Sequence, residues 1–207
     1  MKLIPLLQCL DVNLLDKSKV NIIALHETGH LIAMYAMDMM NYFSSITIKA
    51  GAHTNEVTGA PDQVIGCTNV TRELMEKMTQ FSQELAVIPH SGLDIAKLMR
   101  CAKIKGAELY LPNICRLFGG GAICRHYGIP DEGLCKIDYS HIDLLLSGLG
   151  LANQREIVCQ LVDMYFKTIF VSFDILTKAI YKNLVANGTL DKEQVMQIIA
   201  EWEAFKM

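Results

Sequence analysis

The chain has 207 residues, of which 51% are hydrophobic and 20% are charged, a balance that is typical of a globular protein and excludes a disordered chain. This length is sufficient for one domain with a sizeable hydrophobic core. The formal net charge is −3, without a basic run or an acidic tail, so the composition argues against a protein that binds nucleic acid.

Residues 1–17 form the first predicted segment. They begin with an apolar patch that Pro5 and Asp11 interrupt, and no small-residue cleavage site follows it. We therefore expect a structural segment and not a signal peptide. The most apolar later stretch, residues 157–176, carries charged side chains, which argues against a membrane span.

A long helix is predicted next, over residues 18–40, with Ser18 or Asp16 as its N-cap. The segment "FSSITIKAG" then alternates in polarity and is rich in β-branched residues, which predicts a strand. A loop over residues 52–63 and a second short strand in "QVIGCTN" complete a small β region over residues 44–69.

The remainder of the chain, residues 71–207, is predicted to be helical, with a loop over residues 129–140. The predicted helices cover residues 71–87, 91–105, 107–128, 140–148, 153–187 (one long or broken helix) and 191–205. The sequence shows no repeat, low-complexity tract or linker. We therefore predict a mainly α fold of the α+β kind, in a single domain over residues 1–207, with a small β element after the first long helix.

The seven cysteines are scattered, odd in number and contain no C-x-x-C pair. This pattern argues against a cysteine zinc cluster and against a dense disulfide framework. Reduced, mostly buried thiols in a cytoplasmic protein fit it best.

The predicted first helix contains the segment "IIALHETGHLIAM", residues 22–34. On a helix, residues four apart differ by about 40° around the axis, so His26 and His30 share one face. Two neutral imidazoles there can bind Zn²⁺, and a third protein ligand and a water complete a tetrahedron. Glu27 lies about 100° away from His26, which suits a general base that activates the metal-bound water.

A chance match of two core histidines is the plain alternative to a zinc site. Against it, Glu27 is the only charged residue between Val20 and Met37, and a buried unpaired carboxylate is costly. Gly29 costs about 1 kcal/mol relative to alanine in a helix, which indicates that another part of the protein or a substrate packs closely there. The context favours zinc.

The third zinc ligand does not follow from this segment. The extended motif H-E-x-x-H-x-x-G-x-x-H is excluded, because Ala33 and Ala36 stand where it requires glycine and histidine. A second class of zinc peptidases takes a downstream glutamate from a following helix, and Glu56 is a weak candidate for this role. Gly59 and Pro61 follow it, and no helix is predicted there.

"ALHETGHLI" resembles the zinc helix of FtsH, a family of ATP-dependent, membrane-anchored metalloproteases. "SSITIKAG" is similar to the strand V-x-I-x-x-x-G of that family, and "LFGGGAICR" to its helix motif L-x-G-G-x-x-A-E-x. "SHIDLLL" resembles its S-N-D-hydrophobic turn, and "LVANGTLDKEQVMQII" its final L-x-x-x-x-T-L-x-x-x-E-hydrophobic motif. The motifs keep the order of the family and cover Val20 to Ile199.

This resemblance implies that His26 and His30 bind zinc, that Glu27 is the catalytic base and that Asp143 is the third ligand. Asp138 is the alternative if the loop before it aligns differently. Asp143 also fits a capping box at the start of a helix, a role that would explain a carboxylate without any metal.

The chain departs from the family in two ways. It contains no phosphate loop of the G-x-x-x-x-G-K-[ST] kind, and Gly119–Gly121 are better explained by packing between helices. Ile123 and Cys124 stand where the family has an alanine and a glutamate. The ATPase module and the membrane anchor of the family are not matched either.

We therefore expect an ATP-independent zinc metalloendopeptidase that hydrolyses peptides or unfolded proteins, with Glu27 activating the metal-bound water. The predicted strand from Ser44 to Lys49 could pair with an extended substrate. A separate ATPase could deliver substrates, and the oligomeric state is open. The alternatives are a catalytically degenerate module that binds or regulates, and a helical interaction domain without a site.

Overall fold

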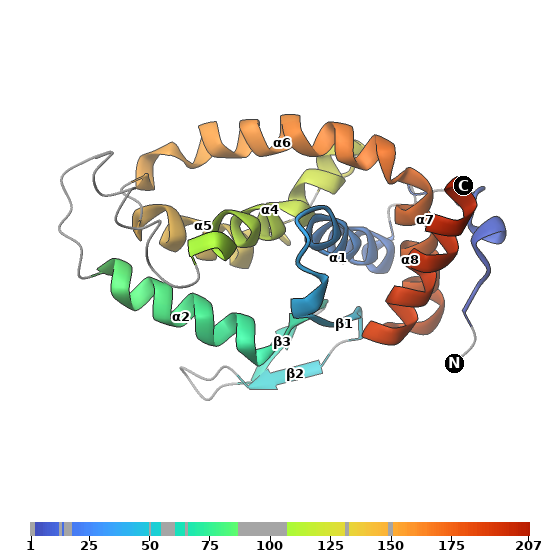
Figure 1. The fold of residues 1–207 in the computed structure, drawn as a ribbon, viewed down its shortest axis with the longest axis horizontal. Helices are drawn as coiled ribbons and strands as arrows, with labels where there is room; N and C mark the ends of the chain where they lie inside the picture. Colours follow the sequence, from blue (N-terminus) through green and yellow to red (C-terminus); the bar gives the residue numbers. More distant parts are fainter. Residues whose placement is uncertain are drawn as a thin grey trace.

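The computed structural model describes residues 3–12, 14, 18–49, 51–54, 61–64, 66–86, 107–130, 133–148 and 151–207. Within these residues the protein is mainly helical, with one three-stranded antiparallel sheet and one two-stranded sheet (Figure 1). The prediction of a mainly α fold with a small β element is confirmed. Among the described helices, none combines the length and the apolar composition that a membrane span requires.

The α-helices are α1 (Lys19–Ala36), α2 (Arg72–Ala86), α4 (Tyr110–His126), α5 (Lys136–Gly148), α6 (Arg155–Ser172), α7 (Asp174–Asn187) and α8 (Lys192–Lys206). Short 3-10 helices are η1 (Leu6–Cys9), η2 (Met40–Tyr42), η3 (Ala107–Leu109) and η4 (Ala152–Gln154). The strands are β1 (Phe43–Thr47), β2 (Gly51–Thr54), β3 (Pro61–Val64), β4 (Cys67–Val70) and β5 (Thr189–Asp191).

Helix α1 lies at the centre of the molecule beside α4, with α6 above them and α7 and α8 at one end (Figure 1). Its residues are apolar on nearly every face, so almost all of its side chains are buried. Ser18 begins the helix as predicted, because its hydroxyl accepts a hydrogen bond from the backbone N–H of Asn21 at 3.4 Å.

The close approach that Gly29 indicates is made by another helix. A Cβ atom added to Gly29 would lie 2.4 Å from the carbonyl oxygen of Gly119, and one added to Gly119 would lie 2.5 Å from that of Gly29. Only glycine permits this distance between α1 and α4. The interpretation of the glycine run as a packing feature is confirmed at Gly119.

Strand β1 is the middle strand of the three-stranded sheet, whose order is β4-β1-β5. Ile46 pairs with Thr68 on one side and with Leu190 on the other, and both pairings are antiparallel. The prediction that the strand Ser44–Lys49 accepts a substrate is therefore wrong, since both of its edges are occupied. Strand β5 was not predicted, because three residues are too short for an alternating pattern.

Several predicted boundaries shift in the structure. The helix expected from Ser140 begins at Lys136, because the chain turns at Gly133 with a φ of 84° and becomes helical soon after it. The helix expected over residues 153–187 is broken at Phe173. The loop expected over residues 52–63 contains parts of β2 and β3.

The helix expected over residues 91–105 lies outside the described residues.

The N-terminal segment packs against α7. The backbone N–H of Ile4 donates to Asn183 Oδ1 at 2.7 Å, and Asn183 Nδ2 donates to the Ile4 carbonyl at 3.1 Å. Leu6 and Cys9 on η1 are buried in the core. None of the described cysteines forms a disulfide bond.

Candidate metal centre

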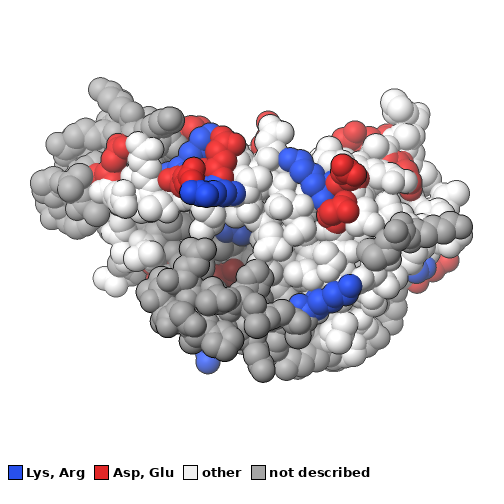
Figure 2. Space-filling model, turned by 90° about the horizontal axis from the view of Figure 1, so that it is seen from below, with Lys and Arg blue, Asp and Glu red and all other residues white. Residues whose placement is uncertain are grey.

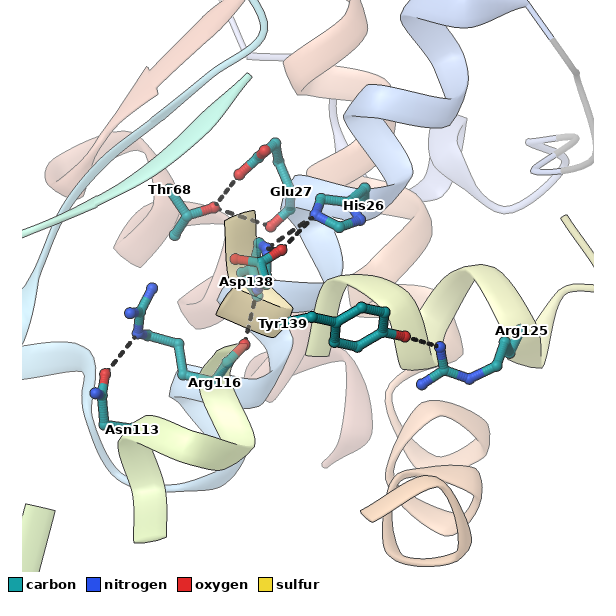
Figure 3. Close-up of polar contacts among 9 residues, drawn as sticks. His26, Glu27, Thr68, Asn113, Arg116, Arg125, Asp138 and Tyr139 are labelled. Atoms are coloured by element: carbon teal, nitrogen blue, oxygen red, sulfur yellow. Dashed lines mark hydrogen bonds and ion pairs between the residues drawn. The ribbon is translucent and has the colours of Figure 1, made fainter. Parts of the chain in front are cut away.

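Three elements bring polar side chains together beside the middle of α1 (Figure 3). Helix α1 provides His26, Glu27 and His30, which are 3%, 6% and 4% exposed. Strand β4 provides Thr68 and helix α5 provides Asp138. Such a group of buried polar side chains inside an apolar protein requires partners.

Three donor atoms form a compact triangle. His26 Nε2 lies 3.0 Å from His30 Nε2 and 3.1 Å from Asp138 Oδ2, and His30 Nε2 lies 3.4 Å from the same oxygen. In a tetrahedral zinc site with ligand distances of about 2.0–2.2 Å, neighbouring ligand atoms are about 3.3 Å apart. The triangle therefore has the edge lengths of three ligands of one zinc ion.

The two histidines differ in their second nitrogen. His30 Nδ1 donates a hydrogen bond to the Arg116 carbonyl at 2.7 Å, which leaves Nε2 as the nitrogen that can bind a metal. His26 Nδ1 is buried and has no hydrogen-bond partner among the described residues.

The charges at the triangle shift the pKa values of its members. Burial alone lowers the pKa of His30, but the charge and hydrogen bond of Asp138 outweigh it and raise the pKa above 6.5. Burial alone raises the pKa of the Asp138 carboxyl, but His30 and His26 reverse this and hold it well below its ordinary value. The carboxylate is thus ionised beside two imidazoles.

The third donor atom of the triangle comes from Asp138, the alternative expected from the sequence, whereas Asp143, the expected third ligand, lies elsewhere. Asp143 Oδ2 instead forms an ion pair with Arg155 Nη1 at 2.6 Å, and both side chains are more than 40% exposed, at 43% and 47%. Asp138 lies in the first turn of α5 because the helix begins at Lys136. Asp143, five residues later, points about 140° away around the axis. Glu56 lies outside the described residues.

Gly120 leaves the room that the histidine rings occupy. A Cβ atom on it would lie 2.6 Å from His26 Cε1 and 2.7 Å from the Nε2 atoms of both His26 and His30. Any other residue would displace the imidazoles from the triangle. The backbone of α4 is therefore the floor of the candidate metal centre.

Glu27 is held beside this triangle and not inside it. The Thr68 hydroxyl lies 2.8 Å from Glu27 Oε2 and 3.1 Å from the Glu27 carbonyl oxygen, and it can donate to either. Gly66 adds to the restraint, because a Cβ atom there would lie 3.0 Å from Glu27 Oε1. The donor atoms of Glu27, His26 and His30 all lie within 4.8 Å of one another. The carboxylate can thus accept a proton close to the metal position.

Arg116 provides a positive charge near these acids. Its Nε donates to Asn113 Oδ1 at 3.0 Å (Figure 3). Burial lowers the pKa of Arg116, whereas the negative charges of Asp138 and Glu27 act in the opposite direction.

Sequence reasoning identified the three residues of α1 but missed Thr68, Gly120 and Arg116. No motif marks Thr68 or Arg116, because each acts through a contact between distant segments. The glycine run was a usable signal, since three adjacent glycines in a helix require a close neighbour.

A separate cavity of about 320 Å³ shares none of these residues. It is lined by Ala122, Arg125, His126, Asp163, Lys167 and Phe170 of α4 and α6. His126 therefore lies away from the triangle.

A scan against protein-family models finds no match to this sequence, and a search of curated proteins finds none either.

Proposed function

We propose that this chain is a zinc-dependent metallopeptidase, similar to the FtsH peptidase domain, that hydrolyses peptides or unfolded proteins. The observation that carries the proposal is the triangle of His26, His30 and Asp138 donor atoms with the Glu27 carboxylate held beside it. Zinc would be held by those three residues, where it supplies a Lewis acid and lowers the pKa of water towards neutral.

Glu27 acts as the general base in this proposal. Its carboxylate accepts the proton of the attacking water and passes it to the amine nitrogen that leaves. The Thr68 hydroxyl orients the carboxylate for this transfer through the 2.8 Å contact. The positive charge of Arg116 interacts with Asp138 and Glu27, and in this proposal it also stabilises negative charge that develops on the substrate carbonyl oxygen.

The substrate strand would lie along β4. Among the described strands, β4 pairs with β1 on one side, and its second edge is proposed to receive the substrate. Thr68 of β4 contacts Glu27, so a peptide added to this edge passes close to the base. On the face shown in Figure 2, basic and acidic side chains lie in small mixed groups, and a hollow has both kinds at its floor. This surface suits a substrate recognised through its backbone more than through its charge.

The Glu27→Gln variant tests the proposal. The amide cannot accept the proton, so hydrolysis of unfolded casein should fall by about 10²-fold or more, while bound zinc stays at the wild-type level. Bound zinc is measured by mass spectrometry of metals. Glu193→Gln, an exposed change on α8, is the matched control and should retain full activity. Equal cleavage by zinc-loaded wild type and Glu27→Gln would overturn the assignment of the base.

A degenerate module that binds without cutting is the second candidate. It is favoured by Ile123 and Cys124, which replace the alanine and glutamate of the FtsH motif and are fully buried. Ile123 packs on Gly29, so this position serves the core and not the metal centre. Wild-type protein that binds zinc but leaves casein intact would support this candidate.

A further inference from the structure

Cys135 lies beside the candidate metal centre, next to His26 and Asp138. Its Sγ, a His26 ring nitrogen and an Asp138 carboxylate oxygen all lie within 4.8 Å of one another. The residue precedes α5 directly, and its carbonyl accepts the backbone N–H of Tyr139 at 2.8 Å, so it already belongs to the first turn. The spacing of three residues places Cys135 and Asp138 on one face of this turn.

Helix α4 also packs closely against the Cys135 thiol. A Cβ atom on Gly121 would lie 2.8 Å from Cys135 Sγ, just as one on Gly120 would meet the two imidazoles. Adjacent glycines of α4 thus make room for His26, His30 and Cys135 together. Cys135 is 2% exposed, so its sulfur is shielded from solvent beside these side chains.

The donor types of the cluster also fit a metal. The His26 side chain is more than nine-tenths buried, and the nitrogen that faces Asp138 and His30 is Nε2. Nδ1 lies on the opposite edge of the ring and has no hydrogen-bond partner among the described residues. The sulfur, nitrogen and oxygen atoms of Cys135, His26 and Asp138 are the donor types that zinc prefers.

We propose that Cys135 is the fourth ligand of the metal, so that the resting site is closed by His26, His30, Asp138 and the Cys135 thiolate. The inference rests on the proposed metal site. On binding, the thiol loses its proton to solvent and the sulfur forms a bond to the metal. The sulfur–nitrogen edge in such a site is about 3.6 Å, so the Cys135 side chain moves towards the histidine nitrogens as the metal binds.

This ligand set has two consequences. A thiolate is a soft donor that favours zinc over magnesium, calcium and manganese, so the site selects its metal. Four protein ligands also fill a tetrahedron, so hydrolysis requires the sulfur to leave the metal. The thiolate thus restrains the proposed peptidase until substrate displaces it.

Cobalt substitution tests the assignment, because Co²⁺ with a thiolate ligand gives an intense charge-transfer band in the near ultraviolet. The full chain is loaded with Co²⁺ as wild type, as Cys135→Ser and as Cys67→Ser. Cys67 is the matched control, since this half-buried thiol of β4 lies on the Glu27 side and contacts Asn69 Oδ1 at 3.2 Å. We expect the band in wild type and Cys67→Ser and its loss in Cys135→Ser. Loss of a residue that only hydrogen-bonds a metal ligand reduces metal affinity by roughly 10–100-fold. The zinc affinity of Cys135→Ser should fall by more than this, because a ligand is lost.

X-ray absorption of the zinc-loaded wild type keeps the test independent of how the variants fold. One sulfur at about 2.3 Å from zinc supports the assignment. Bound metal without sulfur, or a band that disappears in Cys67→Ser, overturns Cys135 as a ligand and leaves the proposed peptidase standing. Wild-type protein that binds neither metal overturns both.

Discussion

Asp138 carries the largest share of the charge balance at the metal centre. Its oxygen lies 3.1 Å and 3.4 Å from the two histidine nitrogens, and its side chain is 16% exposed. An ionised carboxylate in so buried a place needs positive partners, which are two imidazoles that can be protonated or a bound cation. One residue therefore couples the protonation of the site to its affinity for metal.

Substitution of each aspartate should show whether Asp138 or Asp143 binds the metal. Asp138→Asn removes the negatively charged ligand. Its zinc affinity should fall by at least the roughly 10–100-fold that is typical when a residue hydrogen-bonded to a metal ligand is lost. Asp143→Asn removes only an exposed ion pair with Arg155, which contributes about 0–1 kcal/mol to stability. Its zinc affinity should equal that of wild type. Titration with a competing zinc chelator measures both, and the reverse ranking would restore Asp143 as the ligand.

Protons should compete with zinc at His30. Its pKa is raised above 6.5, so a proton there stabilises the metal-free fold below about pH 6.5, and this contribution is lost as the pH rises through the folded pKa. Zinc requires the neutral ring, so its apparent affinity should increase, by up to about tenfold per unit for one released proton, until the pH has passed the raised pKa of His30. Calorimetry in two buffers of different ionisation enthalpy counts the protons. An affinity independent of pH would contradict this coupling.

At the scale of elements, the crossing of α1 and α4 serves packing and shapes the proposed metal site. Gly29 and Gly119 bring the two backbones together, and Gly120, one residue further, leaves space for the imidazoles. Adjacent residues of one helix thus have separate tasks, which point substitutions can distinguish.

Gly119→Ala should destabilise the protein by about 1–3 kcal/mol with and without zinc. Its new Cβ atom would lie 2.5 Å from the Gly29 carbonyl oxygen, and this overlap outweighs the gain of about 1 kcal/mol in helix propensity. Gly120→Ala should mainly reduce zinc affinity, by more than tenfold, because its Cβ atom displaces the histidine rings. Urea denaturation in the presence of chelator, followed by zinc titration, measures both quantities. Wild-type zinc affinity in Gly120→Ala would contradict the role of the glycine floor.

At the scale of the molecule, bound metal would join segments that are far apart in the sequence. His26 and Asp138 are separated by 112 positions, and they belong to α1 and α5. A ligand that binds only the folded chain stabilises the whole of it by mass action.

Zinc at about 100 times its dissociation constant should add about 2.7 kcal/mol to the free energy of unfolding. For a chain of this size the melting temperature then rises by roughly 5–10 °C. Thermal denaturation with zinc and with chelator measures the difference, and Glu27→Gln, which keeps all three donors, should show the same rise. Identical melting temperatures in wild type would exclude the metal site and favour a fold without one.

The local order of residues was sufficient to predict α1, a choice of Ser18 or Asp16 as its N-cap, and the shared face of His26 and His30. These features depend on a helical period and on contacts within a few residues, which any local segment reveals. The pairing of β1 with β5 could not be predicted in this way, because its energy comes from backbone hydrogen bonds between residues more than 140 positions apart, as Thr47 and Thr189 illustrate with a separation of 142.

The choice between Asp138 and Asp143 shows where local reasoning ends. Both residues precede or begin a helix in the sequence pattern, and the residue that faces the histidines depends on the start of α5 at Lys136, after the turn at Gly133. The motif on α1 is a local property of the chain, so the sequence alone places two histidines and a glutamate together. The third donor, Thr68 and the glycine floor belong to other elements, and only the packing of α4, α5 and β4 around α1 brings them within bonding distance.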